Sequence, residues 1–268
     1  MAKTRIQKVL SEAGVASRRT VEQMVLEGRI TVNGSVVAAL PCFVEPATDK
    51  ILVDGRIVRK RPAERIYFLL NKPRGAVCTQ SDPQGRRRAV DLVPEIPGHR
   101  VYCVGRLDVD STGVLLLTND GELTQYLTHP RYGVPKTYVV QIDGVLTGEK
   151  MQRFKSGVFL DGKPTGGAAI KILRSGAGQS TIQVTLTEGR NREIRRVLAR
   201  FGAKVRRLRR VAIGPVTDRG LKIGSFRALR PQEVAKLRRC GTRPYEKRDL
   251  TEKPPRGRTR RGRPAGGC

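Results

Sequence analysis

The sequence predicts an α+β protein with a small N-terminal module and a larger domain, whose mixed, largely antiparallel sheet is flanked by helices and loops. Within the first 60 residues, helical spacing of apolar residues changes to strand-and-turn patterns. Intermixed strand-like runs with few long helices follow. A chain of 268 residues with 38% apolar side chains can bury one sizeable core and carry a small extra module. We therefore expect domains over residues 1–60 and 61–242, followed by a basic disordered tail over 243–268.

The N-terminal module begins with two short predicted helices. Apolar residues fall at helical spacing from Ile6 to Ala13, and Gly14 then stops the run as a C-cap would. Ser17 is placed to cap a second helix, which Gly28 closes.

Two strand-and-turn signals complete this module. Ile30–Val32 meets the turn dipeptide at 33–34 and returns over Val36–Val37, which predicts a hairpin with a type I′ turn. A second strand and turn runs over Ile51–Val58, and a basic connector begins at Arg59.

The larger domain reads as strands with few helices. Its first predicted strand, Ile66–Leu70, ends in a turn that contains Pro73 and Gly75. Further strand-like runs are Val101–Val104, Val114–Leu117, Tyr138–Ile142 and Ile182–Leu186, and helix-like segments are Leu123–Leu127 and Arg192–Arg200.

The periodic pattern of apolar residues does not continue into the C-terminal tail. Residues 254–263 are rich in Arg, Pro and Gly, and such a segment cannot bury enough surface to stay ordered. It is expected to act as a flexible electrostatic arm, and a merely solubilising tail is nearly as well supported.

The charge of the chain indicates a nucleic acid as its partner. Lys and Arg number 53 against 24 acids, a formal net charge of +29 that suits a dense polyanion. A solvated surface and a membrane surface are the alternatives, but basic residues recur in every segment and no long basic amphipathic helix stands alone.

Several classes of protein are not indicated. The sequence has neither an apolar run of about 18 residues nor a signal peptide, so we expect a cytoplasmic protein without a membrane partner. Five scattered cysteines predict reduced thiols, and two isolated histidines give no metal-binding cluster.

Cationic side chains surround the two N-terminal helices, where they could hold a bent phosphate backbone. In order and spacing, the stretch from Arg5 to Gly34 resembles the αL RNA-binding module named after small-subunit ribosomal protein four. The resemblance implies structured-RNA binding and says nothing about chemistry. The residues to which it assigns RNA contact are Arg5, Ser17, Arg18, Arg19, Arg29 and Asn33.

Asp108 lies between a predicted strand ending at Val104 and a polar loop over Asp110–Gly113. A carboxylate at such a position is held by rigid elements and remains reachable. An ordinary turn is the alternative, since Asp and Ser near Gly form Asx and Ser turns. Local chemistry does not distinguish Asp108 from Asp110.

The segment around Asp108 belongs to a longer pattern. Gly105–Gly113 together with Leu115–Gly121 resembles the signature of the RsuA/RluB-type group of bacterial rRNA pseudouridine synthases. Other matches, in the family's order, are Leu70–Gly75, Lys136–Tyr138 and Glu188–Arg196. With the N-terminal module the resemblance covers roughly residues 3–240, and Val114 and Val197 are conservative departures from it.

The resemblance implies roles for individual residues. Asp108 corresponds to the catalytic aspartate, and Arg195 to the arginine that pairs with it and favours its charged form. Arg106 sits where a basic residue approaches the displaced nucleotide, and Leu208 is expected to line the pocket. Tyr138 corresponds to the tyrosine that stacks on uracil, although a core tyrosine is a credible alternative.

The implied reaction needs no cofactor, because it turns uracil on its ribose without gaining or losing atoms. The carboxylate could attack ribose or base, or remove a sugar proton, and the sequence does not choose. The target nucleotide must leave its stack, at a cost of a few kcal/mol.

The region 191–210 contains nine basic residues and one acid, Glu193. Like charges at helical spacing repel one another, which favours phosphate contact over a merely solvated face. We expect Lys72, Arg192 and Arg196 to contact RNA and only Arg195 to turn toward Asp108.

Three functions compete: an rRNA uridine isomerase, a non-catalytic RNA-binding ribosome-assembly protein, and a metal-dependent nuclease or other DNA-acting protein. The third lacks clustered acidic metal ligands. We expect the first, acting as a monomer on 23S rRNA or pre-ribosomal particles, with 16S rRNA as the alternative target. The basic tail and the intact N-terminal module incline the prediction toward the large subunit.

Overall fold

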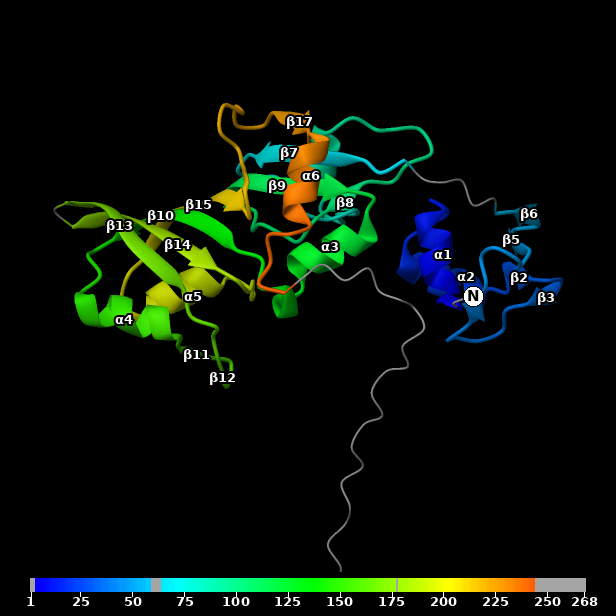
Figure 1. Cartoon of the computed structure of the whole chain (residues 1–268), viewed down its shortest axis with the longest axis horizontal. Helices are drawn as coiled ribbons and strands as arrows, with labels where there is room; N and C mark the ends of the chain where they lie inside the picture. Colours follow the sequence, from blue (N-terminus) through cyan, green and yellow to red (C-terminus); the bar gives the residue numbers. More distant parts are fainter. Residues whose placement is uncertain (1–2, 59–63, 177, 244–268) are drawn as a thin grey trace, which may run out of the picture. The chain divides into compact units, whose positions relative to one another are not determined.

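The computed structural model describes residues 3–58, 64–176 and 178–243. The chain divides into two compact units, one ending at Arg61 and the other beginning at Pro62 (Figure 1). Apart from Arg243, the predicted tail over 243–268 lies outside the described residues.

The N-terminal unit combines two short helices with short strands. Its elements are β1 (Thr4–Arg5), α1 (Ile6–Glu12), α2 (Arg18–Leu26), β2 (Ile30–Val32), β3 (Ser35–Val36), β4 (Phe43–Val44), β5 (Ile51–Val53) and β6 (Arg56–Ile57). Strands β3-β2-β5-β6 form one antiparallel sheet, and β1 pairs with β4. A core that includes Ile6, Leu10, Val21 and Ile30 joins the helices to the sheet.

The predicted helices and hairpins of this unit are confirmed. Ser17 caps α2, since its Oγ accepts the N–H of Thr20 at 3.1 Å. Asn33 and Gly34 take φ values of 51° and 87°, which a two-residue turn with both φ positive requires.

The larger unit is built on a nine-stranded sheet. Its strands are β7 (Tyr67–Lys72), β8 (Tyr102–Cys103), β9 (Thr112–Thr118), β10 (Lys136–Asp143), β13 (Ala169–Gly176), β14 (Gln179–Leu186), β15 (Val205–Ile213), β16 (Val216–Thr217) and β17 (Phe226–Ala228). A separate hairpin consists of β11 (Phe159–Leu160) and β12 (Lys163–Pro164). The helices are α3 (Gly121–Thr128), α4 (Gly148–Ser156), α5 (Glu193–Arg200) and α6 (Pro231–Leu237), with 3₁₀ turns at Ala89–Leu92 and Pro130–Tyr132.

The sheet order is β13-β14-β10-β15-β9-β7-β17, with β16 beside β15 and β8 beside β9. Every pairing is antiparallel except that of β15 with β9. The predicted α+β class with a mixed, largely antiparallel sheet is therefore confirmed.

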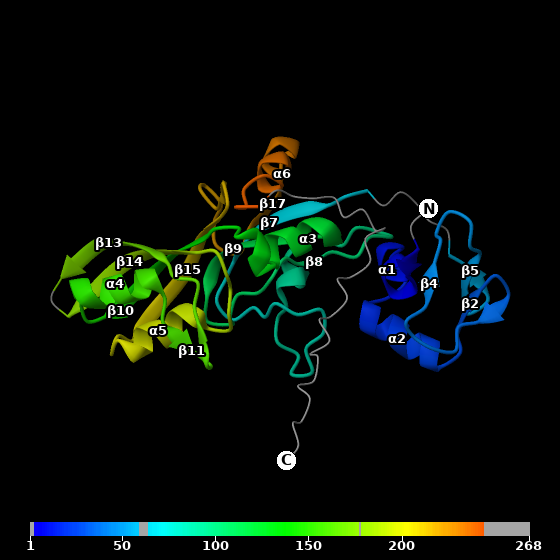
Figure 2. The same ribbon diagram turned by 60° about the horizontal axis from the view of Figure 1, so that its bottom comes forward.

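Helices cover the sheet in two groups, with α4 and α5 near the β13 end and α3 and α6 near the β17 end (Figures 1 and 2). Strand β9 contributes to a separate core on each face: Leu115 and Leu117 to one, Val114 and Leu116 to the other. Burial on both faces explains the continuous apolar run in this strand.

The parallel pairing of β15 with β9 brings two distant segments together at the center of the sheet. Arg209 pairs with Thr112 and Arg210 with Gly113. A Cβ on Gly113 would lie 2.1 Å from the carbonyl oxygen of Arg210, so only glycine permits this approach. The loop that carries Asp108 thereby lies beside β15.

Candidate active site

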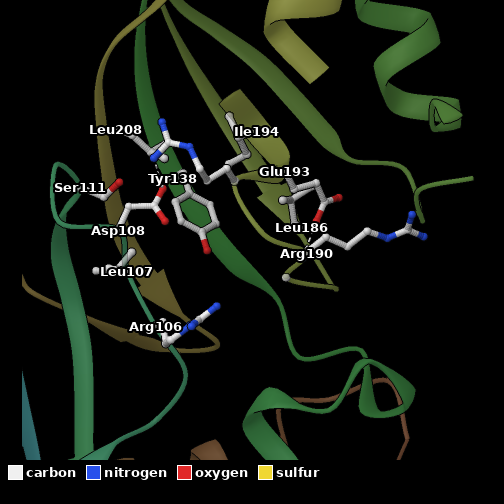
Figure 3. A pocket seen from close by; sticks show the side chains of 12 residues that line it. Arg106, Leu107, Asp108, Ser111, Tyr138, Leu186, Arg190, Glu193, Ile194 and Leu208 are labelled. Carbon is white, nitrogen blue, oxygen red and sulfur yellow. Dashed lines mark hydrogen bonds and ion pairs between the residues drawn. The ribbon is translucent and has the colours of Figure 1, made fainter. Parts of the chain in front are cut away.

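A pocket of about 420 Å³, open mouth included, lies where β10, β15, α5 and the loop before β9 meet. Tyr138 comes from β10 and Leu208 from β15, and both belong to the same core. Asp108 and Leu107 come from the loop, and Ile194 comes from α5. Figure 3 shows the carboxylate of Asp108 beside the ring of Tyr138.

The loop is fixed to the end of β7 by a buried lysine. Lys72 has no exposed surface, and its ammonium group donates to the carbonyl oxygens of Pro73, Asp108 and Ser111 at 3.1, 3.1 and 2.9 Å. Burial lowers the pKa of Lys72. The predicted contact of Lys72 with RNA is wrong, because its side chain is buried and its ammonium group is bound to three carbonyl oxygens of the protein.

Two carboxylates and two guanidinium groups form a cluster at the pocket. Arg192 donates to Asp108 at 3.3 Å and lies 3.7 Å from Asp110. Arg195 lies 2.8 Å from Asp110 and 3.9 Å from Asp108. The prediction that only Arg195 turns toward Asp108 is wrong, since Arg192 makes the shorter contact.

Arg192 has an uncommon backbone conformation just before α5. Its φ is 48°, in the left-handed region, at the residue preceding the helix. The next residue, Glu193, is 4% exposed and accepts the N–H of Arg190 at 3.0 Å. Burial raises the pKa of Glu193 to about 7. Burial of this acid in the pocket lining was not predicted, because the residues around it in the sequence are mostly basic.

The other pocket residues named from the sequence take distinct positions. Tyr138 is 9% exposed and Leu208 is 7% exposed, so each forms part of both the core and the pocket wall. Arg106 is exposed and lies across the pocket from Leu208 (Figure 3). No carboxylate among the described residues pairs with Arg106. The structure therefore brings Asp108, Tyr138, Arg195, Leu208 and Arg106 to one site.

The side chains expected to bind RNA in the N-terminal unit fall into two groups. Arg5, Arg18 and Arg19 are exposed. Arg29 instead donates to both carboxylate oxygens of Asp54 at 2.7 Å.

Three further residues assigned to RNA are held by contacts within their own unit. Ser17 caps α2, and Asn33 bridges Asp49 and the N–H of Lys50. In the larger unit, Arg196 binds the carboxylate of Asp161. Their observed contacts are structural, and RNA contact by them stays a prediction.

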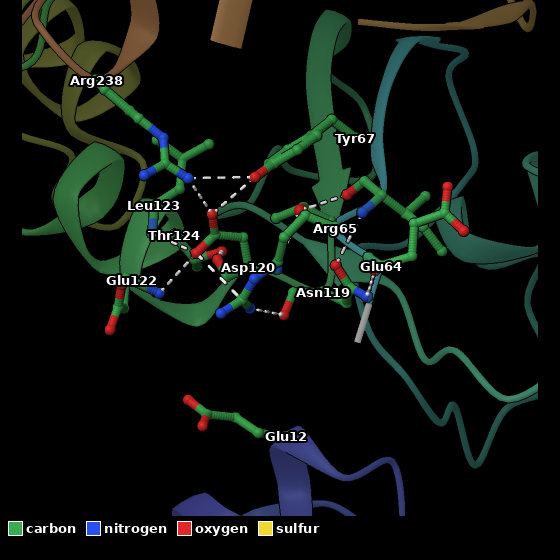
Figure 4. Close-up of polar contacts among 12 residues, drawn as sticks. Glu12, Glu64, Arg65, Tyr67, Asn119, Asp120, Glu122, Leu123, Thr124 and Arg238 are labelled. Carbon is green, nitrogen blue, oxygen red and sulfur yellow. Dashed lines mark hydrogen bonds and ion pairs between the residues drawn. The ribbon is translucent and has the colours of Figure 1, made fainter. Parts of the chain in front are cut away.

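The acidic residue of the motif Leu115–Gly121 is structural. Asp120 is 1% exposed and accepts the N–H groups of Glu122 and Leu123 at the start of α3. Its other oxygen accepts from Tyr67 at 2.9 Å and from Arg238 at 2.8 Å (Figure 4). One carboxylate thus ties together β7, α3 and the end of α6.

The described residues contain neither a cluster of metal-binding side chains nor a membrane-spanning helix. Across residues 3–58, 64–176 and 178–243, no three His, Cys, Asp or Glu side chains gather as a metal ion would need. No helix in those same stretches is long and apolar enough to cross a membrane.

Comparison with known proteins identifies the family. Residues 66–200 match the family described as RNA pseudouridylate synthase. A protein from Aquifex aeolicus, described as an uncharacterized RNA pseudouridine synthase, is 42% identical over 239 residues, which cover 88% of this chain and 94% of that protein. The chain belongs to the RNA pseudouridylate synthase family. Its N-terminal residues 4–39 match the S4 domain, which confirms the predicted resemblance of that module.

Two further similarities support this pseudouridine synthase assignment. A Bacillus subtilis protein, named ribosomal large subunit pseudouridine synthase B, is 42% identical over 87% of this chain and 95% of its own length. A crystal structure of a pseudouridylate synthase matches with a TM-score of 0.64 at 29% identity, covering 87% of this chain and 99% of that one. The predicted isomerase class is confirmed, and the non-catalytic and nuclease alternatives are set aside.

Proposed function

We propose that this pseudouridine synthase isomerises one uridine of large-subunit (23S) ribosomal RNA and that Asp108 is its catalytic residue. The observation that carries the proposal is the position of the Asp108 carboxylate, beside the Tyr138 ring and 3.3 Å from Arg192. An aromatic surface and a carboxylate at one opening fit a flipped nucleotide whose base stacks while its glycosidic bond is exposed.

The choice of large-subunit rRNA is supported by relatedness and by charge. The Bacillus subtilis relative carries a large-subunit name and aligns over nearly its whole length. The S4 domain and the net charge of +29 suit a structured RNA. We further propose that the enzyme acts as a monomer in the cytoplasm.

The reaction breaks the bond from uracil N1 to ribose C1′, turns the base and joins C5 to C1′. The proton lost from C5 is balanced by one gained at N1, so no cofactor is required. Asp108 supplies the carboxylate that acts on the nucleotide, and Tyr138 stacks on the uracil. Arg192 and Arg195 hold the acidic cluster in place, and the exposed Arg106 contacts the nucleotide's phosphate.

The test uses unmodified large-subunit and small-subunit rRNA, each incubated with the wild type and with Asp108→Asn. Pseudouridine is mapped by carbodiimide-dependent stops of reverse transcription. We expect the wild type to modify one uridine of the large-subunit RNA, and Asp108→Asn to bind this RNA with unchanged affinity while forming no detectable product.

Each proposal has its own contrary outcome. Modification of small-subunit RNA alone would overturn the target assignment. Product formation by Asp108→Asn at the wild-type rate would overturn the catalytic role of Asp108. Asp161→Asn is the matched control, because this carboxylate pairs with Arg196 outside the pocket and is 69% exposed.

A further inference from the structure

A second groove lies beside the C-terminal end of α5, away from the catalytic pocket. Phe159, Arg153 and Arg200 line it, and the ring of Phe159 is 61% exposed. The groove encloses about 820 Å³, open mouth included, and none of its lining residues is acidic. A single exposed phenylalanine is ordinary on a protein surface, but here it shares one hollow with two cations.

The backbone that carries this ring is braced. The neighbouring Leu160 is 2% exposed and anchors β11 in the core, so strand alternation turns Phe159 outward. Val158 donates its N–H to Thr165 Oγ1 at 3.0 Å. Arg200 donates to the carbonyl oxygen of Phe159. The ring is therefore presented on a fixed support.

The two arginines keep their charges available for an anion. The guanidinium group of Arg153 lies 5.9 Å from the center of the Phe201 ring. Within the part of the chain that the structure describes, no carboxylate forms an ion pair with Arg153 or Arg200. The acid on the β11–β12 turn, Asp161, is already bound by Arg196.

The groove is connected to the catalytic pocket through α5. Glu193, at the start of this helix, lines the pocket, and Arg200, at its end, lines the groove, a separation of about 10 Å along the helix axis. Arg190 also lines the pocket and donates to the carbonyl oxygens of Lys163 and Pro164 on β12. Figures 1 and 2 show the hairpin beside α5.

We propose that this groove binds a single-stranded nucleotide flanking the target uridine, with its base stacked on Phe159 and its phosphate held by Arg153 and Arg200. The inference rests on the proposed function, since it takes the catalytic pocket to be filled by the target. Single-stranded RNA fits because aromatic rings and guanidinium planes stack on unpaired bases, while duplex RNA hides the faces of its bases.

The first test is direct, because the chain contains no tryptophan. Phe159→Trp introduces a single tryptophan, whose fluorescence is excited selectively over that of the tyrosines. The variant is titrated with a single-stranded oligouridylate of about ten nucleotides, a length within the usual range of single-strand sites. We expect saturable quenching by stacking. Ile223→Trp is the control, since Ile223 is 64% exposed and precedes β17 at the other edge of the sheet. Equal quenching of both variants, or none, would overturn the proposal.

The second test separates binding from chemistry. Phe159→Ala should raise the dissociation constant for unmodified large-subunit rRNA by about 5- to 150-fold, the equivalent of one lost stacking contact. Its single-turnover rate at saturating RNA should equal that of the wild type, and Phe159→Trp should restore the affinity. Ile223→Ala should change neither quantity.

A protein partner at the groove would give a different result. Phe159→Ala would then keep its affinity for naked rRNA and lose affinity only for immature large subunits, which would overturn the RNA assignment. The quenching titration does not depend on turnover. It can therefore fail while Asp108→Asn behaves as proposed, and it can succeed if the wild type forms no pseudouridine.

Discussion

The guanidinium group of Arg195 lies 2.8 Å from the carboxylate of Asp110, closer than its 3.9 Å separation from Asp108. Arg192 lies 3.3 Å from Asp108 and 3.7 Å from Asp110, so two positive and two negative charges balance at the pocket. Arg195 is the more buried arginine, with 12% of its side chain exposed against 46% for Arg192. Asp110 thus holds the buried arginine, while Asp108 lines the pocket.

This arrangement predicts a positioning role for Asp110. Asp110→Asn should lower the single-turnover rate by about 10- to 100-fold. Arg195 would lose its nearest carboxylate and would be attracted toward Asp108, which would displace the Asp108 carboxylate from its position. RNA affinity should stay near that of the wild type. Rapid-quench measurement of pseudouridine at saturating rRNA checks this. A rate equal to that of Asp161→Asn would show that Asp110 does not position the site.

The ring of Tyr138 predicts that an aromatic and an aliphatic replacement of this residue differ in nucleotide affinity. Tyr138→Phe keeps the stacking surface and should retain the wild-type affinity within about threefold, whereas Tyr138→Leu should lose about 1 to 3 kcal/mol of nucleotide binding. Binding is measured with unmodified rRNA and the inactive Asp108→Asn background. Circular dichroism is the control for folding, because the ring also belongs to the core. Equal binding by Tyr138→Leu would contradict stacking.

Removal of the buried Lys72 should destabilise the protein. Lys72→Met leaves the carbonyl oxygens of Pro73, Asp108 and Ser111 without their donor. We expect the free energy of unfolding to fall by about 2 to 4 kcal/mol. Urea denaturation measures the change, and Lys171→Met is the control because Lys171 is exposed on β13. Similar losses in the two variants would argue against a special role for Lys72.

Glu193 predicts a dependence of stability on pH. Its pKa is raised from 4.5 to about 7 by burial, so the folded state holds a proton that the unfolded state releases between these values. Stability from this group is present below pH 4.5 and is lost as pH rises to about 7. Glu193→Gln should not show this loss of stability as pH rises. The pH-dependent change in the free energy of unfolding should therefore differ between wild type and variant by about 1 to 3 kcal/mol at neutral pH.

The comparison is made by urea denaturation of wild type and Glu193→Gln at several pH values. The glutamine oxygen can still accept the N–H of Arg190, which keeps the comparison conservative. Parallel curves for the two proteins across pH 4.5–7 would rule out a raised pKa.

The N-terminal arginines predict different contributions to RNA affinity. Arg18 and Arg19 are exposed, and their double replacement by Gln should reduce the salt slope of rRNA binding by about 1 to 2. Arg29→Gln should change the slope less, because Asp54 and Glu27 already offset the charge of Arg29. Filter binding across salt concentrations tests both. A larger effect of Arg29→Gln would reverse this assignment.

Local features were determined by the sequence itself. The turn at Asn33–Gly34 and the cap at Ser17 follow from backbone preferences and side-chain chemistry over a few residues. Apolar runs in the sequence predicted the strands β7, β9, β10 and β14, and the motif around Asp108 indicated the family. Strand β15 was not predicted, since its arginines hide its alternation.

The tertiary structure alone decided which charges meet. Arg192 and Lys72 looked like other cations of a basic chain, and charge in a sequence carries no information about direction or burial. Pairing of β15 with β9 joins residues almost a hundred positions apart, and this long-range contact forms the pocket wall beside Asp108. The sequence determined that a carboxylate stands in this loop; packing decided that Lys72 holds the loop and that Arg192, as well as Arg195, faces the acid.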